Sequence, residues 1–369
     1  MSEAGLNMHD LPTPALIVDV DRLDANLRRT QEYADRQGVT LRPHTKTHKS
    51  PYLAARQVEM GAKGICVAKL GEAEVMVDAG LDDVFLANTM LGPDKARRAA
   101  TIAQRVQFAV GVDHPLQADQ LSAALQDNDR SITVLMEVDS GSGRGGAPAD
   151  EVPELLRHIR DLPKLELRGL YTYEGFTYGA ASVSEMATRH REAQCLMVNL
   201  AKECQGVFTG PPVVSMGSTP SLLADIDLIP GITEIRPGTS IFLDAAQALL
   251  AGGVHHGAAH VLATVVSRHG NRALLDSGSK ALTSDSRLGG VCATEGKGLL
   301  VDYGLVINRL SEEHGVVEGP GVERLTVGEK VRVLPNHICP AVNLFEQIYL
   351  VQDSVVERIL PVAARGRLV

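Results

Sequence analysis

The sequence predicts an α/β fold, in which a (β/α)8 barrel of the TIM type is followed by a domain made only of β-strands. Up to about residue 251, short apolar runs rich in β-branched residues alternate with longer segments of helical periodicity. Parallel strands need helical crossovers of this kind. The later part of the chain has short β-like runs separated by Gly, Asp, Ser and Pro, at residues 261–267, 272–276, 298–301, 329–334 and 345–351. We therefore assign residues 21–251 to the barrel and residues 252–369 to an all-β domain.

The elements of the barrel follow one another in a regular order. Residues 15–18 form a short β-rich run, and residues 21–37 have the periodicity of a helix that Gly38 ends. Strand–helix pairs then repeat eight times, with strands that begin near Leu41, Gly64, Val84, Val106, Ile132, Leu167, Val213 and Ile232. The clearest helical segments between them are residues 71–79, 93–104, 115–125, 151–161 and 182–203. A doubly wound open sheet is the competing architecture, but no Gly-x-Gly-x-x-Gly motif opens the first pair.

Composition argues against several classes of protein. A chain of 369 residues, with 44% hydrophobic and 22% charged residues, has the profile of a soluble globular protein of two domains. Its net charge of -9, without an extended basic block, argues against a nucleic-acid partner. Five widely spaced cysteines suit a reducing compartment better than a disulfide framework, and neither a signal peptide nor a membrane-spanning apolar stretch is evident. We therefore expect a cytoplasmic metabolic protein.

Residues 41–51 place two lysines, two histidines and an arginine where a short strand ends and a helix is about to begin. Burial and neighbouring cations disfavour the ammonium form of a lysine at such a place, which makes its amine a better nucleophile. Lys46 is therefore a candidate for a lysine that reacts with a carbonyl group. From these residues alone, a basic surface turn is an equally good interpretation.

A resemblance to a known family favours the first interpretation. The segment Pro43-His44-Thr45-Lys46-Thr47-His48-Lys49 resembles the pyridoxal-phosphate (PLP) lysine motif of the family of D-threonine aldolases and eukaryotic-type, zinc-dependent D-serine dehydratases. These enzymes share the alanine racemase fold (fold type III). The resemblance extends over about residues 11–350, and it implies that Lys46 carries the cofactor and that His44 belongs to the cofactor site. It also implies that residues 1–20 join the β domain, because the first strand of this fold does so.

Gly217, Ser218 and Thr219 follow the seventh predicted strand, and barrels often hold a phosphate at that position. Glycine lets backbone N–H groups approach phosphate oxygens, the two hydroxyls can donate, and the start of the next helix adds its positive end. A Gly-Ser-Thr triplet by itself is more often a helix N-cap. This triplet also resembles the phosphate-binding loop of the family, so we expect it to hold the phosphate of PLP.

Two arginines lie in segments that are similar to arginine-bearing motifs of the alanine racemases, residues 138–146 with Arg144 and residues 235–238 with Arg236. The resemblance implies that one arginine lies near the phenolic oxygen of PLP and the other near its pyridine nitrogen, with Gly238 and Thr239 in the same pocket. An arginine cannot give up its proton, so it would leave that nitrogen unprotonated and the ring a weaker electron sink. A structural ion pair is the alternative for each arginine.

Two further positions bear on the cofactor pocket. Tyr173 follows the sixth predicted strand and is a candidate for contacting the cofactor ring or the substrate, although a half-buried structural tyrosine is about as good an interpretation. Ser240 stands where members of the family often have a tyrosine, so that wall of the pocket departs from the family pattern.

His337 and Cys339 are two residues apart in a segment that we expect to be extended, so their side chains should project to one side. Imidazole and thiolate together suit Zn²⁺. The spacing alone is a weak signal, because a buried cysteine near a histidine is common. Members of the family, however, carry a C-terminal His-x-Cys or His-x-Asp pair that binds a divalent metal beside the PLP. The resemblance thus implies Zn²⁺, or another divalent metal such as Mn²⁺, and the cysteine version is associated with zinc and dehydration.

Taken with the resemblance, these residues predict a PLP- and zinc-dependent lyase that acts on D-3-hydroxy amino acids. The preferred reaction is that of a D-serine or D-threo-3-hydroxyaspartate dehydratase, which yields a 2-oxo acid and ammonia. The alternative is a metal-dependent D-threonine aldolase, which yields glycine and an aldehyde. The same residues serve either route, and no second acid or base is identified, because Phe176 stands where a histidine would be useful.

Two other functions are less favoured. An amino-acid racemase needs a base on each face of the substrate, and residues 276–282 lack the tyrosine that alanine racemases carry in the corresponding region. Non-catalytic PLP-binding proteins have the barrel alone, without the β domain and the metal pair. The fold also implies a homodimer.

Overall fold

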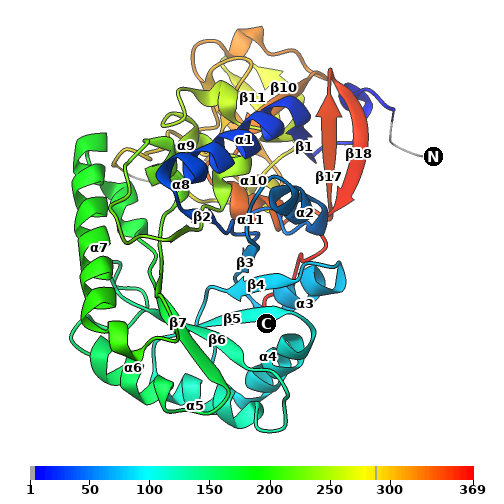
Figure 1. Ribbon diagram of the computed structural model, residues 1–369. Helices are drawn as coiled ribbons and strands as arrows, with labels where there is room; N and C mark the ends of the chain where they lie inside the picture. The colour runs from blue at the N-terminus through cyan, green and yellow to red at the C-terminus, as the bar shows by residue number, and fades with distance from the viewer. Residues whose placement is uncertain (1–4, 287–288) are drawn as a thin grey trace. The chain divides into compact units, whose positions relative to one another are not determined.

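The computed structural model describes residues 5–286 and 289–369 (Figure 1). Contacts divide the chain into two compact units. The β unit consists of Met1–Thr30, Thr47–Ser50 and Thr239–Arg365, and the barrel unit consists of Gln31–Lys46, Pro51–Gly238 and Gly366–Val369. The domain limits expected from the sequence, 21–251 for the barrel and 1–20 with 252–369 for the β domain, stay a prediction.

The barrel unit is built on an eight-stranded parallel sheet in the order β2-β9-β8-β7-β6-β5-β4-β3. The strands are β2 (Thr40–Leu41), β3 (Ile65–Val67), β4 (Asp83–Leu86), β5 (Gln107–Val112), β6 (Ile132–Glu137), β7 (Leu165–Tyr171), β8 (Val213–Ser215) and β9 (Glu234–Ile235). Beyond Leu41 the chain also pairs with β3, because Cys66 N donates to Pro43 O and Thr45 N donates to Cys66 O, both at 2.8 Å. These bonds close the sheet into a barrel. The predicted α/β fold with eight parallel strands is therefore confirmed.

Helices alternate with these strands along the chain (Figure 1). They are α1 (Val20–Gln37), α2 (Pro51–Glu59), α3 (Leu70–Asp78), α4 (Pro93–Arg105), α5 (Pro115–Ala124), α6 (Val152–Arg160), α7 (Val183–Glu203) and α8 (Thr219–Leu223), with the 3-10 turns η2 (Gly175–Gly179) and η3 (Gln205–Val207). In α6 the buried residues are Val152, Leu155, Leu156 and Ile159, the spacing that places four side chains on one face. Within the described residues, no helix combines the length and the apolar character that crossing a membrane requires.

The strands of the barrel are buried on both sides. Residues such as Val110, Val134 and Leu167 belong to the large apolar cluster that includes the helices, whereas Phe85 and Tyr171 pack together in a second cluster. Parallel strands covered on both faces read as nearly continuous apolar runs. This is why the sequence shows them as short apolar segments and not as alternating ones.

Gly169 lies where the pairing of β6 with β7 shifts its register, and its φ is +154°. A Cβ atom there would stand 1.9 Å from the backbone oxygen of Val213 on β8. We therefore expect Gly169→Ala to lower the free energy of unfolding by about 3 kcal/mol or more, because the backbone of a central strand must move. Urea unfolding of the purified protein measures this.

Gly206→Ala is the matched control, because no atom lies within 4 Å of a Cβ at position 206. Its free energy of unfolding should stay within about 0.5 kcal/mol of the parent protein. Equal unfolding midpoints for both variants would contradict the close approach of β7 and β8.

The β unit contains a mostly antiparallel sheet in the order β13-β12-β16-β10-β1-β17-β18, and β11, β15 and β14 continue from β10. The strands are β1 (Ala15–Asp19), β10 (Ala259–His269), β11 (Arg272–Leu275), β12 (Leu299–Leu300), β13 (Leu305–Val306), β14 (Arg309–Leu310), β15 (Gly315–Glu318), β16 (Lys330–Leu334), β17 (Gln347–Gln352) and β18 (Val355–Pro361). Its short helices are α9 (Ala245–Ala248), α10 (Ser279–Leu282) and α11 (Ile338–Val342), with the 3-10 turns η1 (Met8–Asp10), η4 (Thr239–Ile241), η5 (Val254–His256) and η6 (Val322–Arg324). Strand β1 lies between β10 and β17, so the first strand of the chain shares a sheet with the last ones.

Candidate active site

In the barrel unit, the residues that the sequence predicts for cofactor binding follow the strands at one end of the sheet. Parallel strands all present their carboxyl ends at the same mouth of a barrel, where barrel enzymes place their chemistry. Lys46 comes after β2, Arg144 after β6, Tyr173 after β7, and residues 217–219 after β8. Arg236 and Gly238 come after β9. The topology therefore collects these residues at one mouth.

Tyr173 brings two of the predicted residues together. The Lys46 Nζ atom lies 5.5 Å from the centroid of the Tyr173 ring, and the Arg144 guanidinium carbon lies 4.7 Å from the same centroid. Cations at these distances are attracted to the ring face. Gly175 makes room for this ring, because a Cβ at position 175 would stand 2.3 Å from it. The half-buried Lys46 thus lies beside an aromatic ring that a second cation also approaches.

The backbone around Lys46 is held by neighbouring loops. His44 Nδ1 accepts a hydrogen bond from Lys46 N at 3.4 Å, and His44 N donates to Pro237 O at 2.9 Å. His44 is therefore a link between the lysine and the loop after β9. This contact places the motif that contains Gly238 against the motif that contains Lys46.

Two carboxylates hold the loop that carries Arg144. The Asp139 carboxylate accepts hydrogen bonds from the backbone N–H groups of residues 141–143, and Asp113 Oδ2 accepts from Gly146 N at 3.0 Å. Burial acts to raise the pKa of Asp139, but these backbone hydrogen bonds outweigh it and hold the pKa below its usual range. The loop is therefore fixed at its start and at its end.

The Gly217–Ser218–Thr219 loop contains the N-cap of a helix and a buried hydroxyl group. Gly217 has a φ of +109°, and a Cβ there would stand 2.8 Å from the Ile235 side chain. Ser218 is the N-cap of α8 and exchanges hydrogen bonds with Ser221. Thr219 is 2% exposed, and its buried hydroxyl has no hydrogen-bond partner among the described residues. A buried hydroxyl beside a permissive glycine suits an anion.

One part of the sequence argument for this loop needs correction. The dipole of the following helix was expected to help bind a phosphate, but α8 has only five residues. A helix of this length has a small dipole. Any anion at this loop would therefore depend chiefly on the Thr219 hydroxyl, because the N–H groups of Gly217 and Ser218 donate to Glu174 and Ser221.

Arg236 is 8% exposed, and its guanidinium points at protein atoms. It donates to Thr172 O at 2.6 Å and to the hydroxyl of Ser215, and its central carbon lies 5.2 Å from the Tyr171 ring centroid. These contacts tie together the ends of β7, β8 and β9. The expected position of Arg236 beside a pyridine nitrogen stays a prediction.

In the β unit, the segment with His337 and Cys339 is not a strand. Strand β16 ends at Leu334, His337 is the N-cap of α11, and Cys339 lies inside that helix. Asp244 Oδ2 accepts a hydrogen bond from Ile338 N at 3.2 Å and so begins the helix. The expectation that strand alternation aligns the two side chains is therefore wrong. Whether they bind one metal stays a prediction.

Each of the two candidate ligands nevertheless has a polar partner behind it. The His337 Nδ1 atom lies 2.8 Å from Asp285 Oδ2, and the Cys339 Sγ atom lies 3.1 Å from the hydroxyl of Thr47. A carboxylate on one imidazole nitrogen orients the other nitrogen as a metal ligand. Among the described residues, no group of three or more His, Cys, Asp or Glu side chains is arranged to hold a metal. His337 and Cys339 would supply two ligands, fewer than the three protein ligands that are usual at a catalytic zinc ion, so the binding of a metal here stays a prediction.

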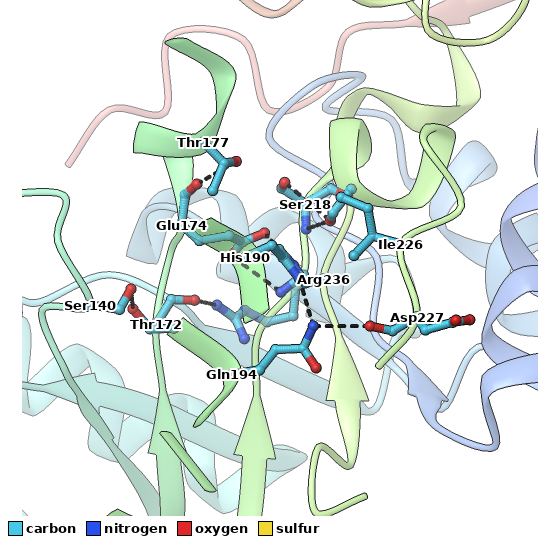
Figure 2. A network of polar contacts seen from close by, with 12 residues as sticks. Ser140, Thr172, Glu174, Thr177, His190, Gln194, Ser218, Ile226, Asp227 and Arg236 are labelled. Atoms are coloured by element: carbon cyan, nitrogen blue, oxygen red, sulfur yellow. Dashed lines mark hydrogen bonds and ion pairs between the residues drawn. The ribbon is translucent and has the colours of Figure 1, made fainter. Parts of the chain in front are cut away.

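Several of these contact residues were not identified from the sequence. Asp285 is 52 residues away from His337 in the chain, and no local pattern connects them. Thr47 directly follows Lys46, so the lysine motif could have pointed to it. Behind the Gly217 loop, Glu174, His190 and Gln194 form a buried polar network that also gives no sequence signal (Figure 2).

Thr239 belongs to the β unit, where its hydroxyl donates to the side chain of Gln247. This hydrogen bond explains the burial of Thr239 without a ligand. Its expected place in the cofactor pocket stays a prediction.

Comparison with known proteins gives two family matches that together span most of the chain. Residues 18–246 match the family described as alanine racemase, N-terminal domain. Residues 258–351 match the family described as putative serine dehydratase domain.

Curated relatives and solved structures match nearly the whole length of the chain. The chain is 35% identical to a D-threonine aldolase of Arthrobacter sp, over 96% of this chain and 93% of the relative. It is 33% identical to the D-threo-3-hydroxyaspartate dehydratase of Delftia sp. (strain HT23), over 89% and 91%. The crystal structure of D-threonine aldolase from Filomicrobium marinum matches with a TM-score of 0.90 and 31% identity over the full length of both chains.

A further match is to a solved variant of a relative. It is a cysteine-to-alanine variant of a D-threo-3-hydroxyaspartate dehydratase in a metal-free form. It matches with a TM-score of 0.88 and 28% identity, over 96% of this chain and 98% of the other.

Proposed function

This chain belongs to the family of D-threonine aldolases and D-serine dehydratases, PLP-dependent lyases with the alanine racemase fold, and we propose that it is a zinc-dependent dehydratase of small D-3-hydroxy amino acids. The substrate would lose its α-proton and its β-hydroxyl as water, and hydrolysis of the product would release a 2-oxo acid and ammonia. The observation that carries this proposal is the pairing of His337 with a cysteine, Cys339. A thiolate is a soft ligand that favours Zn²⁺ over Mg²⁺ or Mn²⁺.

The residues present fit both groups that the reaction needs. Bound PLP would withdraw electrons from the α-carbon, and the metal would polarise the C–O bond of the β-hydroxyl. Lys46 would hold the cofactor and then move the α-proton, since its amine is free once the substrate has taken its place. The Thr219 hydroxyl would hold the phosphate, and Tyr173 would border the ring. His337 and Cys339 would hold the metal, with Asp285 and Thr47 orienting them.

The environment of Phe176 supports dehydration. Aldol cleavage needs a base that removes the proton of the β-hydroxyl. In the loop after β7, where we would look for a histidine in that role, the chain has Phe176, whose ring lies 3.5 Å from the position that a Cβ on Gly141 would take. An apolar ring there can exclude water, but it cannot accept a proton.

The second candidate function is that of a D-threonine aldolase. The relative with 35% identity and the solved structure with a TM-score of 0.90 both carry that name. A metal that holds and acidifies the β-hydroxyl would serve cleavage of the Cα–Cβ bond as well.

A product assay separates the two functions. Incubation with D-serine, D-threonine and D-threo-3-hydroxyaspartate should release ammonia and 2-oxo acid in equal amounts, without glycine. The L-enantiomers serve as controls and should give neither product. Release of glycine and aldehyde without ammonia would show that the protein is an aldolase and not a dehydratase. The proposals for the cofactor and the metal would still hold.

We also propose that the protein acts in the cytoplasm as a homodimer. None of its five cysteines, Cys66, Cys195, Cys204, Cys292 and Cys339, forms a disulfide, which suits a reducing compartment. The net charge of -9 is consistent with a small-molecule substrate and no nucleic-acid partner. Light scattering during size-exclusion chromatography would give the mass of the assembly.

A further inference from the structure

Three polar side chains behind the Gly217–Thr219 loop are completely buried. Glu174, His190 and Gln194 each have 0% exposure, and they come from the loop after β7 and from helix α7 (Figure 2). Glu174 Oε2 accepts a hydrogen bond from Gly217 N at 3.3 Å, and its carboxylate also interacts with the side chain of Ser218. The Glu174 carboxylate therefore contacts the backbone of the loop to which we assign the phosphate.

The hydrogen bonds of Gln194 fix the orientation of its amide. Its Oε1 accepts from Ile229 N at 2.6 Å, so the other end of the amide must be the nitrogen. That Nε2 donates to Asp227 O at 3.0 Å and lies 2.8 Å from His190 Nδ1. An amide nitrogen can only donate, so His190 Nδ1 accepts and carries no proton.

The proton of the His190 imidazole therefore lies on Nε2. This atom faces Glu174 Oε1 at 3.6 Å, which is longer than an ordinary hydrogen bond. Among the described residues neither atom has a nearer polar partner, so the N–H group is directed at the carboxylate. Burial acts to raise the pKa of Glu174, but the interactions of its carboxylate with His190 and Ser218 outweigh it and hold the pKa below its usual range.

We propose that Gln194 and His190 are positioning residues that act through Glu174 on the phosphate-binding loop. Gln194 selects the tautomer of His190, His190 orients the Glu174 carboxylate, and Glu174 holds the N–H of Gly217. The Thr219 hydroxyl is thereby left to receive a phosphate. This inference rests on the proposed binding of PLP at this loop.

The test compares two forms of the cofactor that differ only in the phosphate. Apoprotein is titrated with PLP and with pyridoxal, and the change in cofactor absorbance gives each dissociation constant. Glu174→Gln and His190→Leu should weaken PLP binding about tenfold or more, because each leaves a buried polar group without its partner. Pyridoxal binding should change by about twofold at most, because pyridoxal lacks the phosphate that we assign to the loop.

His190→Gln is the matched control, because a glutamine can place an N–H group near the position of Nε2. This variant should recover most of the PLP affinity that His190→Leu loses. If His190 served only for packing, His190→Gln and His190→Leu would have similar affinities for PLP, because their side chains are of similar size. Thermal unfolding shows whether each variant is folded. If His190→Leu does not fold, the test relies on Glu174→Gln, which keeps the shape of the side chain.

The possible failures are distinguishable. If the parent protein binds PLP no more tightly than pyridoxal, the phosphate site itself is wrong. Thr219→Val, which removes the direct donor, should weaken PLP binding in any case. If it does so while Glu174→Gln and His190→Leu bind PLP as the parent does, or lose PLP and pyridoxal in parallel, the positioning role is overturned and the phosphate site stands.

Discussion

Lys46→Ala should lose the covalent attachment of PLP and nearly all activity. The amine of Lys46 is the nucleophile that we assign to the cofactor and the group that moves the α-proton, so its removal eliminates two functions. Activity should fall by about a thousandfold or more. Borohydride reduction followed by peptide mapping should place the pyridoxyl group on Lys46 in the parent protein and on no peptide of the variant.

Lys49→Ala is the matched control for this experiment. Lys49 belongs to the same motif, but it is buried and its ammonium donates to Ala364 O at 3.5 Å. The reduced cofactor should stay on Lys46 in this variant. A label on Lys49 or on Lys280, which is paired with Glu312 and Glu313 at the surface, would remove Lys46 from its assigned role.

His337→Ala should release the metal while the cofactor stays bound. The variant removes one of two proposed protein ligands, and the remaining thiolate cannot hold a divalent cation tightly by itself. Zinc content after dialysis, measured by mass spectrometry, should fall to background, and activity should fall by about a hundredfold or more. The absorbance of the bound cofactor should persist, because Lys46 is unchanged.

Asp285→Asn tests the same site in a graded way. The amide oxygen can still face His337 Nδ1 without the negative charge, so zinc should be retained but bound about 10- to 100-fold more weakly in competition with a chelator. His269→Ala, at an exposed histidine of the same unit, should leave the zinc content unchanged. Zinc contents that are equal in His337→Ala and the parent protein would exclude His337 as a ligand.

The local sequence was sufficient to predict where the strands of the barrel lie. Their apolar runs reflect burial on both faces, and this burial depends on the composition of each segment and not on distant partners. The five helices expected between residues 71 and 203 correspond to α3–α7, because their apolar residues recur at helical spacing. Short strands such as β13 and β14, with two residues each, carry too few residues to show a period.

Some parts of the candidate site could likewise be predicted from the local sequence, and others could not. A motif of adjacent residues made Lys46 a candidate, and the position of each motif after a strand predicted that Lys46, Arg144 and Tyr173 lie at one mouth of the barrel, where the Tyr173 ring contacts both cations. The helical turn at His337 was missed, because the Asp244 carboxylate that begins it comes from 94 residues earlier in the chain. A residue whose conformation depends on such a distant cap cannot be assigned from its neighbours.

By itself, the sequence determined the α/β class, the order of the barrel elements and the family, since these depend on composition, periodicity and short motifs. Only the tertiary structure decided which polar groups stand behind those motifs. The contacts of Asp285 with His337 and of Gln194 with His190 depend on the orientation of the two side chains as well as on the distance between them. A hydrogen bond forms only where the folded backbone points a donor at an acceptor, and residue identities along the chain do not contain that geometry.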